Sequence, residues 1–287
     1  MQKLIVQGGA KLRGELDLQG SKNSALPIMA AAYLCRGECI LHNCPKLTDI
    51  YAASRILNYI GCKCSFADNT AVITSAQSGH TAIPEELMQE MRSSIIFLGA
   101  LLGKNKTGTV SYPGGCELGS RPIDMHLSSF RKMGVDIKEK FGRITCSVRK
   151  NIHGAKISLP FPSVGATENI MLCAVLAEGE TVINNAAREP EIKDLADFLR
   201  CCGAKIKGDG ESSIVIEGVK ELHGCEYTVM SDRIAGATYL AAAASAGGEI
   251  IIHKACVGCM EPFISLLDQT GCSIYTIDDG IYLRSGL

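Results

Sequence analysis

Gly179-Glu180-Thr181-Val182-Ile183 is the clearest copy of a short segment that occurs four times along the chain. In each copy a glycine precedes β-branched and apolar residues, a composition typical of a β-strand. The other copies begin at Gly37, Gly108 and Gly248, so that successive glycines are separated by 71, 71 and 69 residues. A constant spacing of this size indicates tandem structural repeats.

A second set of glycines follows the same period. Gly61, Gly134, Gly203 and Gly271 are separated by 73, 69 and 68 residues. The segment before Gly203 has the apolar spacing of an amphipathic helix, and the glycine suits the position after a helix end. A pair of strand-like segments follows, at 204–206 and 213–217.

Each repeat also contains a helix that is apolar on nearly all sides, as expected for a helix enclosed by other elements. These four segments are 23–34, 91–102, 166–177 and 233–246. Strands that alternate with helices in this order predict an α/β (α+β) fold of stacked βαβαββ units.

The composition limits the classes of function. The chain has 287 residues, 46% hydrophobic and 21% charged, with a net charge of −1, which suits a globular protein of one large or two ordinary domains. This charge argues against a general nucleic-acid interface. The start of the sequence does not resemble a signal peptide, and the apolar run 234–246 is too short to span a bilayer. We therefore expect a soluble, cytoplasmic protein without a membrane partner.

Fourteen cysteines are many for a protein of this kind. Most lie in apolar segments, where a thiol behaves as a small hydrophobic group; they are Cys35, Cys39, Cys62, Cys64, Cys146, Cys173, Cys201, Cys202 and Cys272. Cys256 and Cys259 have zinc-knuckle spacing, but no second pair follows at a suitable distance. We expect core or loop thiols and no metal; a thiol- or zinc-dependent sensor is the alternative.

The starts of the apolar helices share a chemical property. Free N–H groups and the helix dipole favour anions there, and Lys22, Arg92 and Arg233 add fixed positive charge. If the repeats pack side by side, these helix starts form one patch that binds phosphates or carboxylates. The alternative is that the three side chains are ordinary solvated charges beside helix caps, with Asp232 as one such cap.

A glycine-rich loop carries the most reactive candidate. In Pro113-Gly114-Gly115-Cys116-Glu117-Leu118-Gly119-Ser120-Arg121-Pro122-Ile123-Asp124, the glycines let a ligand approach the backbone and place a thiol near a guanidinium. A cysteine in such a setting can act as an acid or a nucleophile. The alternative is an inert loop thiol.

Several of these segments resemble the enolpyruvyl transferase family, and within it the enzymes that act on UDP-N-acetylglucosamine. The resemblance runs along the whole chain and is carried by the segments 20–27, 113–124, 163–169 and 185–191. Relatives from the shikimate pathway share the fold but lack a cysteine loop of this kind. The resemblance implies transfer of the enolpyruvyl group from phosphoenolpyruvate to the 3′-hydroxyl of UDP-N-acetylglucosamine, the first committed step of peptidoglycan precursor synthesis, without a cofactor.

The resemblance also implies an inside-out α/β barrel in each of two domains, with three repeats per domain and the active site between them. On this basis, residues 19–229 form a complete domain with the cysteine loop and the nucleotide-sugar subsite. Residues 1–18 and 230–287 form a partial second domain.

The resemblance assigns roles to individual residues. Cys116, Lys22 and Arg121 are the expected catalytic residues: Cys116 gives a proton to the vinyl carbon, forms a covalent adduct with phosphoenolpyruvate and is alkylated by fosfomycin. Lys22 and Asn23 contact phosphoenolpyruvate, and Arg92 and Arg121 neutralise phosphate charge. The expected nucleotide subsite contains Arg121, Pro122, Ile123, Asp124, Met125, Phe161, Pro162, Ser163 and Val164.

The chain departs from the family in length. Six repeats of ~70 residues need about 420 residues, whereas four repeats are present here. In relatives the remaining part contains the aspartate that acts as base and arginines that bind phosphoenolpyruvate. We expect a truncated chain with weak nucleotide-sugar binding and little turnover, which exposes 234–246 to self-association. The alternative is a non-catalytic module that binds UDP-sugars.

Overall fold

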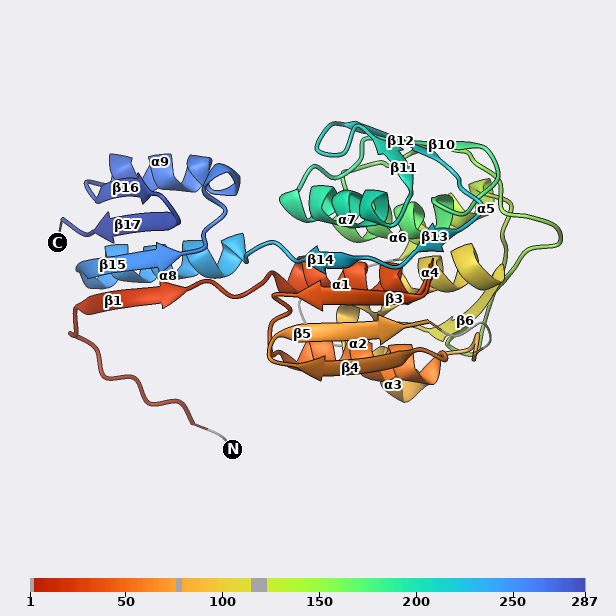
Figure 1. The fold of residues 1–287 in the computed structure, drawn as a ribbon, viewed down its shortest axis with the longest axis horizontal. Coiled ribbons are helices and arrows are strands. Elements are labelled where there is room, and N and C mark those ends of the chain that lie inside the picture. Colours follow the sequence, from red (N-terminus) through yellow and green to blue (C-terminus); the bar gives the residue numbers. More distant parts are fainter. Residues whose placement is uncertain (1–2, 76–78, 115–122, 287) are drawn as a thin grey trace. The chain divides into compact units, whose positions relative to one another are not determined.

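The computed structural model describes residues 3–75, 79–114 and 123–286. The chain divides into two compact units (Figure 1). Unit 1 contains Met1–Ser21 and Met230–Leu287, and unit 2 contains Lys22–Val229.

Four sheets repeat one strand order, which confirms the predicted repeats. A strand or bridge runs parallel to the strand after the marker glycine, and an antiparallel hairpin completes the sheet. Unit 1 has the order β1 (Leu12–Asp17), β15 (Gly248–His253), β17 (Gly280–Arg284) and β16 (Ser273–Ile277). The first sheet of unit 2 has the order β14 (Glu226–Thr228), β3 (Glu38–His42), β5 (Thr70–Thr74) and β4 (Lys63–Ala67). The second sheet of unit 2 has the order β9 (Lys156–Ser158), β10 (Glu180–Asn184), β12 (Ser213–Glu217) and β11 (Lys205–Lys207). The third sheet of unit 2 has the order β6 (Thr107–Ser111), β8 (Arg143–Ser147) and β7 (Asp136–Lys140). A parallel bridge from Ala82 to Thr109 takes the place of the parallel strand found in the other sheets.

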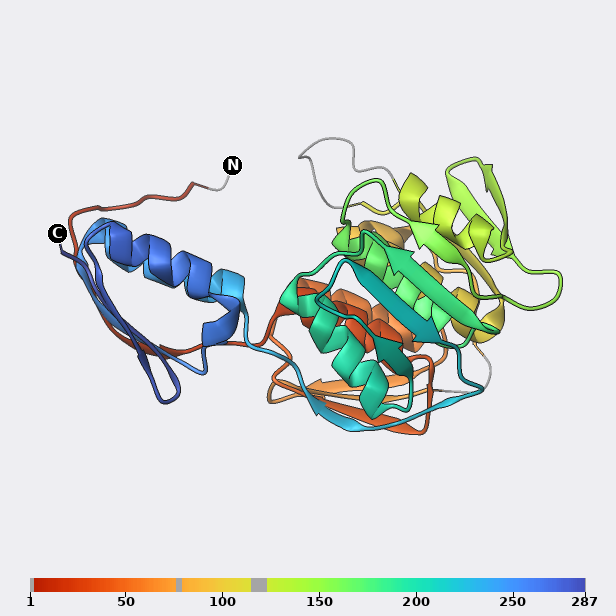
Figure 2. The same cartoon turned by 90° about the horizontal axis from the view of Figure 1, so that it is seen from above.

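The helices of unit 2 lie inside its sheets (Figures 1 and 2). The inner helices are α1 (Lys22–Ala32), α4 (Ile96–Asn105) and α6 (Val164–Ala174), and the amphipathic helices are α2 (Thr48–Tyr59), α5 (Asp124–Lys132) and α7 (Pro190–Cys201). A short α3 (Glu85–Gln89) and the 3₁₀ turn η1 (Arg92–Ile95) precede α4. The inner helices are enclosed as predicted. The continuous helix predicted over 91–102 is wrong, because η1 occupies its first part.

The marker glycines take the conformation predicted for them. Gly61, Gly134 and Gly203 have φ values of 103°, 89° and 98°, in the left-handed region that favours glycine. Each directly follows the residue that caps the amphipathic helix of its repeat. The glycines therefore end the helices and turn the chain into the closing strands.

Two glycines of α4 show that the three inner helices run in the same direction. The backbone of Gly99 lies against Asn169, and that of Gly103 lies against Leu172 and Cys173, so α4 and α6 are parallel. The Leu34 side chain, just beyond the end of α1, also reaches Gly103. The helix starts therefore share the opposite end of unit 2.

Unit 1 covers its inner helix on one face. α8 (Arg233–Ala246) buries Leu240 and Ala243 in a core that includes side chains of the sheet, and α9 (Glu261–Gln269) packs beside it. Ile234 and Tyr239 are each 48% exposed. The prediction that this helix is enclosed on nearly all sides is therefore wrong for the described residues. Asp232 caps α8, as the alternative interpretation of this helix start held, because its carboxylate accepts hydrogen bonds from the N–H groups of Ile234 and Ala235.

The cysteines follow the predicted burial with two corrections. Cys201 is exposed at the end of α7, whereas the sequence places it in an apolar segment. Cys256 and Cys259, predicted as free loop thiols, are joined by a disulfide in the 3₁₀ turn η2 (Val257–Cys259) and the residue before it. Within the described ranges, no helix combines the length and apolar character that crossing a bilayer requires.

Candidate functional site

Lys22 and Asn23 form the exposed start of a buried helix. From Ser24 to the end of α1 every side chain is buried, whereas Asn23 is exposed. The Lys22 ammonium lies 2.9 Å from the Asp49 carboxylate in the first turn of α2. Since the Lys22 side chain remains 37% exposed, this ion pair holds a positive charge at a helix start that is open to solvent.

Arg92 brings a second positive charge to the start of the α4 segment. It is the first residue of η1, and its charge acts on His126 in α5. Burial lowers the pKa of His126 to about 4, with Arg92 as the next cause. The neutral imidazole accepts a hydrogen bond at Nδ1 from the Asn169 amide, at 2.8 Å. The Asn169 amide also contacts Ile95 and Gly99, so that the α4 segment, α5 and α6 are connected through one buried amide.

The start of α6 is accessible to solvent, and a serine side chain caps it. The Ser163 hydroxyl accepts a hydrogen bond from the Ala166 N–H, at 3.4 Å, and Val164 is the first helical residue. Phe161 and Pro162 precede it on the surface, and Phe161 is 57% exposed. A helix start beside an exposed aromatic ring suits a ligand that has both an anionic group and a flat ring.

The remaining predicted residues divide into buried, exposed and undescribed positions. At the start of α5, Ile123 and Met125 are buried and Asp124 is exposed, so of these three Asp124 presents its side chain to solvent. Cys116, Arg121 and Pro122 lie outside the described residues. The structure therefore places Lys22, Arg92 and Ser163 at helix starts on one end of unit 2, and their roles remain predictions.

Two polar residues that hold this end together were not assigned from the sequence. Asp49 positions Lys22, and Asn169 hydrogen-bonds across three elements. A polar amide within the apolar segment 166–177 was a signal for Asn169. The pairing of Asp49 with Lys22 spans 27 residues and has no local signal.

A hollow of about 390 Å³ lies at the other end of the inner helices. Lys104 and Lys106, at the end of α4, line it together with Glu178 and Lys220. This hollow is therefore separate from the helix starts. At the same end of α1, three buried sulfur atoms, those of Cys35, Cys39 and Cys202, lie within 4.8 Å of one another.

The buried His126 predicts a pH dependence of stability. The pKa of His126 in the folded chain lies below the unfolded value of about 6.5. The contribution of neutral His126 to the free energy of unfolding is therefore present above pH ~6.5 and is lost as the pH falls towards 4. Over this range the wild type should lose up to about 3 kcal/mol that a His126→Gln variant does not lose. Urea unfolding at several pH values measures the difference.

The comparison with the variant is necessary because Glu168 acts in the opposite direction. Burial is the largest cause that raises the pKa of Glu168, and repulsion from Glu191 is the next. Protonation of Glu168 therefore stabilises the folded chain as the pH falls. A His80→Gln variant, which changes an exposed histidine, is the matched control and should retain the wild-type dependence. Identical curves for His126→Gln and the wild type would refute the assignment.

The comparisons with known proteins agree on one family. The profile of EPSP synthase (3-phosphoshikimate 1-carboxyvinyltransferase) matches residues 6–284. UDP-N-acetylglucosamine 1-carboxyvinyltransferase 2 from Caldanaerobacter subterraneus is 50% identical over 281 residues, covering 98% of this chain and 67% of the relative. The UDP-N-acetylglucosamine 1-carboxyvinyltransferases of Endomicrobium trichonymphae and Nitratidesulfovibrio vulgaris are 48% and 42% identical, covering 88% and 99% of this chain.

Solved structures show the same fold. The enolpyruvyl transferase NikO from Streptomyces tendae matches with a TM-score of 0.85 at 21% identity, over 97% of this chain and 67% of its own. EPSP synthase from Acinetobacter baumannii matches with a TM-score of 0.78 at 20% identity, over 98% and 66%. The chain spans 61–68% of the length of the three curated relatives. On its sequence and its fold, the chain belongs to the EPSP synthase family of enolpyruvyl transferases.

Proposed function

We propose that this chain binds phosphoenolpyruvate and UDP-N-acetylglucosamine for transfer of the enolpyruvyl group to the 3′-hydroxyl of the sugar. The observation that carries the proposal is the common end of the inner helices, where Lys22 and Arg92 add positive charge to open helix starts. The names of the curated relatives support the choice of substrates. Peptidoglycan precursor synthesis in the cytoplasm, and through it cell shape and division, belongs to the same proposal.

The two substrates match the chemistry of this end of unit 2. Phosphoenolpyruvate carries a phosphate and a carboxylate, which suit Lys22, Asn23, Arg92 and Arg121. The diphosphate of the nucleotide sugar suits the start of α6 at Ser163 and Val164, because helix N–H groups bind anions there. The exposed Phe161 ring offers a surface for the uracil.

Cys116 supplies acid catalysis in this proposal. Its thiol gives a proton to the methylene carbon of phosphoenolpyruvate, and the sugar oxygen then bonds to the adjacent carbon as the hydroxyl proton leaves to a base. Loss of a proton from the methyl group and departure of phosphate restore the double bond. By the family resemblance, the base and the arginines that bind the carboxylate belong to the part of the relatives that this chain does not match.

Fosfomycin tests the assignment of Cys116. We expect one adduct per chain, located on Cys116 by peptide mass spectrometry, because nearby positive charge favours the reactive thiolate. A Cys116→Ser variant should form no adduct, and Cys201→Ser, which removes an exposed thiol, should react like the wild type. An adduct on another cysteine, or none, would contradict the catalytic role.

Phosphate release distinguishes a catalytic chain from a binding module. The assay contains phosphoenolpyruvate and UDP-N-acetylglucosamine, with and without the unmatched third of the Caldanaerobacter relative as a separate chain. Turnover that needs both chains and an intact Cys116 supports enolpyruvyl transfer. Binding of the nucleotide sugar without turnover under either condition indicates a non-catalytic module.

A further inference from the structure

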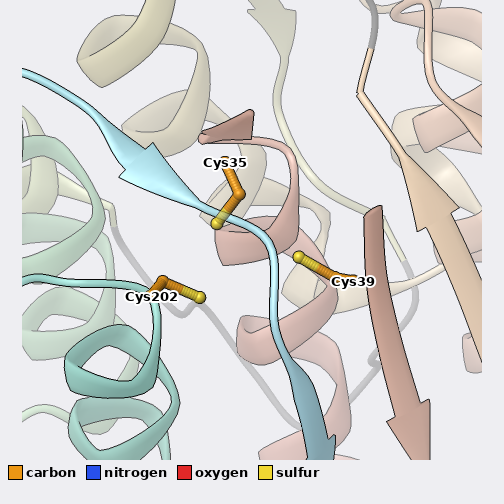
Figure 3. Close-up of side chains that lie close together, drawn as sticks. All are labelled: Cys35, Cys39 and Cys202. Carbon is orange, nitrogen blue, oxygen red and sulfur yellow. The ribbon is translucent and has the colours of Figure 1, made fainter. Parts of the chain in front are cut away.

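Four cysteines meet where the chain closes unit 2. β13 (Leu222–His223) and β14 pair in parallel with β2 (Cys35–Arg36) and β3, and we call this place the closure seam. Cys35 and Cys39 come from the first repeat, Cys202 follows α7, and Cys225 precedes β14. The sulfur atoms of the first three lie within 4.8 Å of one another, and Figure 3 shows them turned towards a common space. The Cys225 sulfur lies 3.4 Å from that of Cys202.

The backbone holds these cysteines in place without a ligand. Cys35 is paired with β13 in the strand register. The Ile40 N–H, next to Cys39, donates to the Cys225 carbonyl at 3.0 Å, and the His223 N–H donates to the Cys202 carbonyl at 3.0 Å. A ligand that bridges the sulfur atoms of Cys35, Cys39 and Cys202 would therefore meet a preformed arrangement, with Cys225 beside Cys202.

The spacing of the sulfur atoms suits one tetrahedral metal ion. Zinc–thiolate bonds of ~2.3 Å place the four sulfur atoms of a tetrahedral site ~3.8 Å apart. The Cys202–Cys225 separation of 3.4 Å is close to this value, and the sulfur atoms of Cys35, Cys39 and Cys202 lie within 4.8 Å of one another. Cys35, Cys39 and Cys202 are at most 1% exposed, whereas Cys225 is half-buried and leaves a path for an ion.

The chemistry of the sulfur ligands also favours a soft cation. Thiolates buried among apolar side chains are costly unless a positive charge balances them. Soft sulfur donors select ions such as zinc over magnesium or calcium, and a closed set of four thiolates is typical of structural zinc.

We propose that Cys35, Cys39, Cys202 and Cys225 form a structural zinc site at the closure seam. Each thiol that binds the ion releases its proton to solvent, so the step needs no oxidant or reductant. Cys39 and Cys202 are 163 residues apart in the sequence, and the ion therefore joins the first repeat of unit 2 to the end of the third. The proposal goes beyond the sequence-based expectation that Cys35, Cys39 and Cys202 serve as small hydrophobic groups.

The first experiment measures metal content and spectrum. The full chain is purified under reducing conditions, loaded with one equivalent of zinc, desalted and analysed by mass spectrometry for metals; about one zinc per chain is expected. Loading with cobalt instead should give thiolate charge-transfer absorption and the strong visible bands of tetrahedral cobalt. Retention of no zinc by the wild type, together with a cobalt spectrum that lacks these bands, would overturn the proposal.

Matched variants locate the site. Cys39→Ser and Cys202→Ser should lose the zinc and the cobalt bands. Cys44→Ser, which changes a buried cysteine outside the cluster, and the double variant Cys256→Ser/Cys259→Ser should keep both. Zinc that disappears only in the double variant would assign the metal to the Cys256–Cys259 segment instead.

The thermal stability of the wild type tests the proposal without any substitution. Removing zinc from the wild type with a chelator should lower Tm by roughly 5–10 °C, and adding zinc back should restore it. An unchanged Tm, or a Cys202–Cys225 disulfide found by mass spectrometry in the purified chain, would show that the seam closes without a metal.

Discussion

Replacing Lys22 by glutamine should lower the rate of enolpyruvyl transfer roughly 10²–10³-fold, the usual effect of losing one preorganised charge-stabilising group. The Lys22 ammonium lies at the start of α1, where it forms an ion pair with the Asp49 carboxylate. Glutamine keeps much of the side-chain length but removes the charge that would bind phosphate. The measurement is phosphate release with the unmatched third of the Caldanaerobacter relative supplied as a separate chain.

The Lys22→Gln variant should fold like the wild type, since a partly exposed ion pair contributes only about 0–1 kcal/mol to the free energy of unfolding. Lys46→Gln changes an exposed lysine of the same unit and is the matched control, with an expected change of rate below about twofold. Asp49→Asn keeps the positive charge of Lys22 and should cost far less than the loss of Lys22 itself. Equal rates for Lys22→Gln and Lys46→Gln would remove Lys22 from the site.

The repeat architecture was predictable because its signals are local. The glycines that end the amphipathic helices, such as Gly203, occur at a constant period, and each requires a left-handed backbone that few other residues adopt. The exposure of α8 was not predictable from its own residues. An alanine-rich helix has the same sequence whether its outer face is covered or open, so burial depends on elements elsewhere.

In the candidate site too, residues with a local signal were predictable and residues with distant partners were not. Lys22 and Arg92 follow from charge at helix starts, because the helix dipole acts within the first turn. Asp49 and Asn169 act through partners far away in the sequence, which no spacing rule identifies. The cysteines of the closure seam were missed for the same reason: strand pairing between the first and third repeats brings Cys39 and Cys202 together.

Replacing Asn169 by leucine should destabilise the chain by about 3–5 kcal/mol, because each buried polar group left without a partner costs about 1–3 kcal/mol. The Asn169 amide donates to the Ile95 carbonyl at 2.9 Å and to the His126 ring at 2.8 Å, and its oxygen accepts from the Gly99 N–H at 2.7 Å. Leucine has a similar size but satisfies none of these groups. Thermal unfolding should show a Tm lower by roughly 10 °C.

The geometry explains why this side chain matters beyond its hydrogen bonds. Ile95 O and Gly99 N are the pair that an uninterrupted α-helix would join, and the amide contacts both at the point where η1 gives way to α4. A Cβ at position 99 would lie 2.2 Å from the Asn169 oxygen, so the close approach also requires glycine. Losing the amide should therefore disturb the start of α4 and the position of Arg92.

Two measurements separate this role from a general effect of removing an asparagine. Asn151→Ala, which changes an amide at an exposed contact, should cost less than about 1 kcal/mol. Below the unfolding temperature, Asn169→Leu should also bind UDP-N-acetylglucosamine more weakly than Asn151→Ala, because the starts of α4 and α6 would no longer be held together. A loss of stability no greater than that of Asn151→Ala would show that the three buried groups find other partners. The helix starts would then owe their arrangement to apolar packing between α4 and α6 alone.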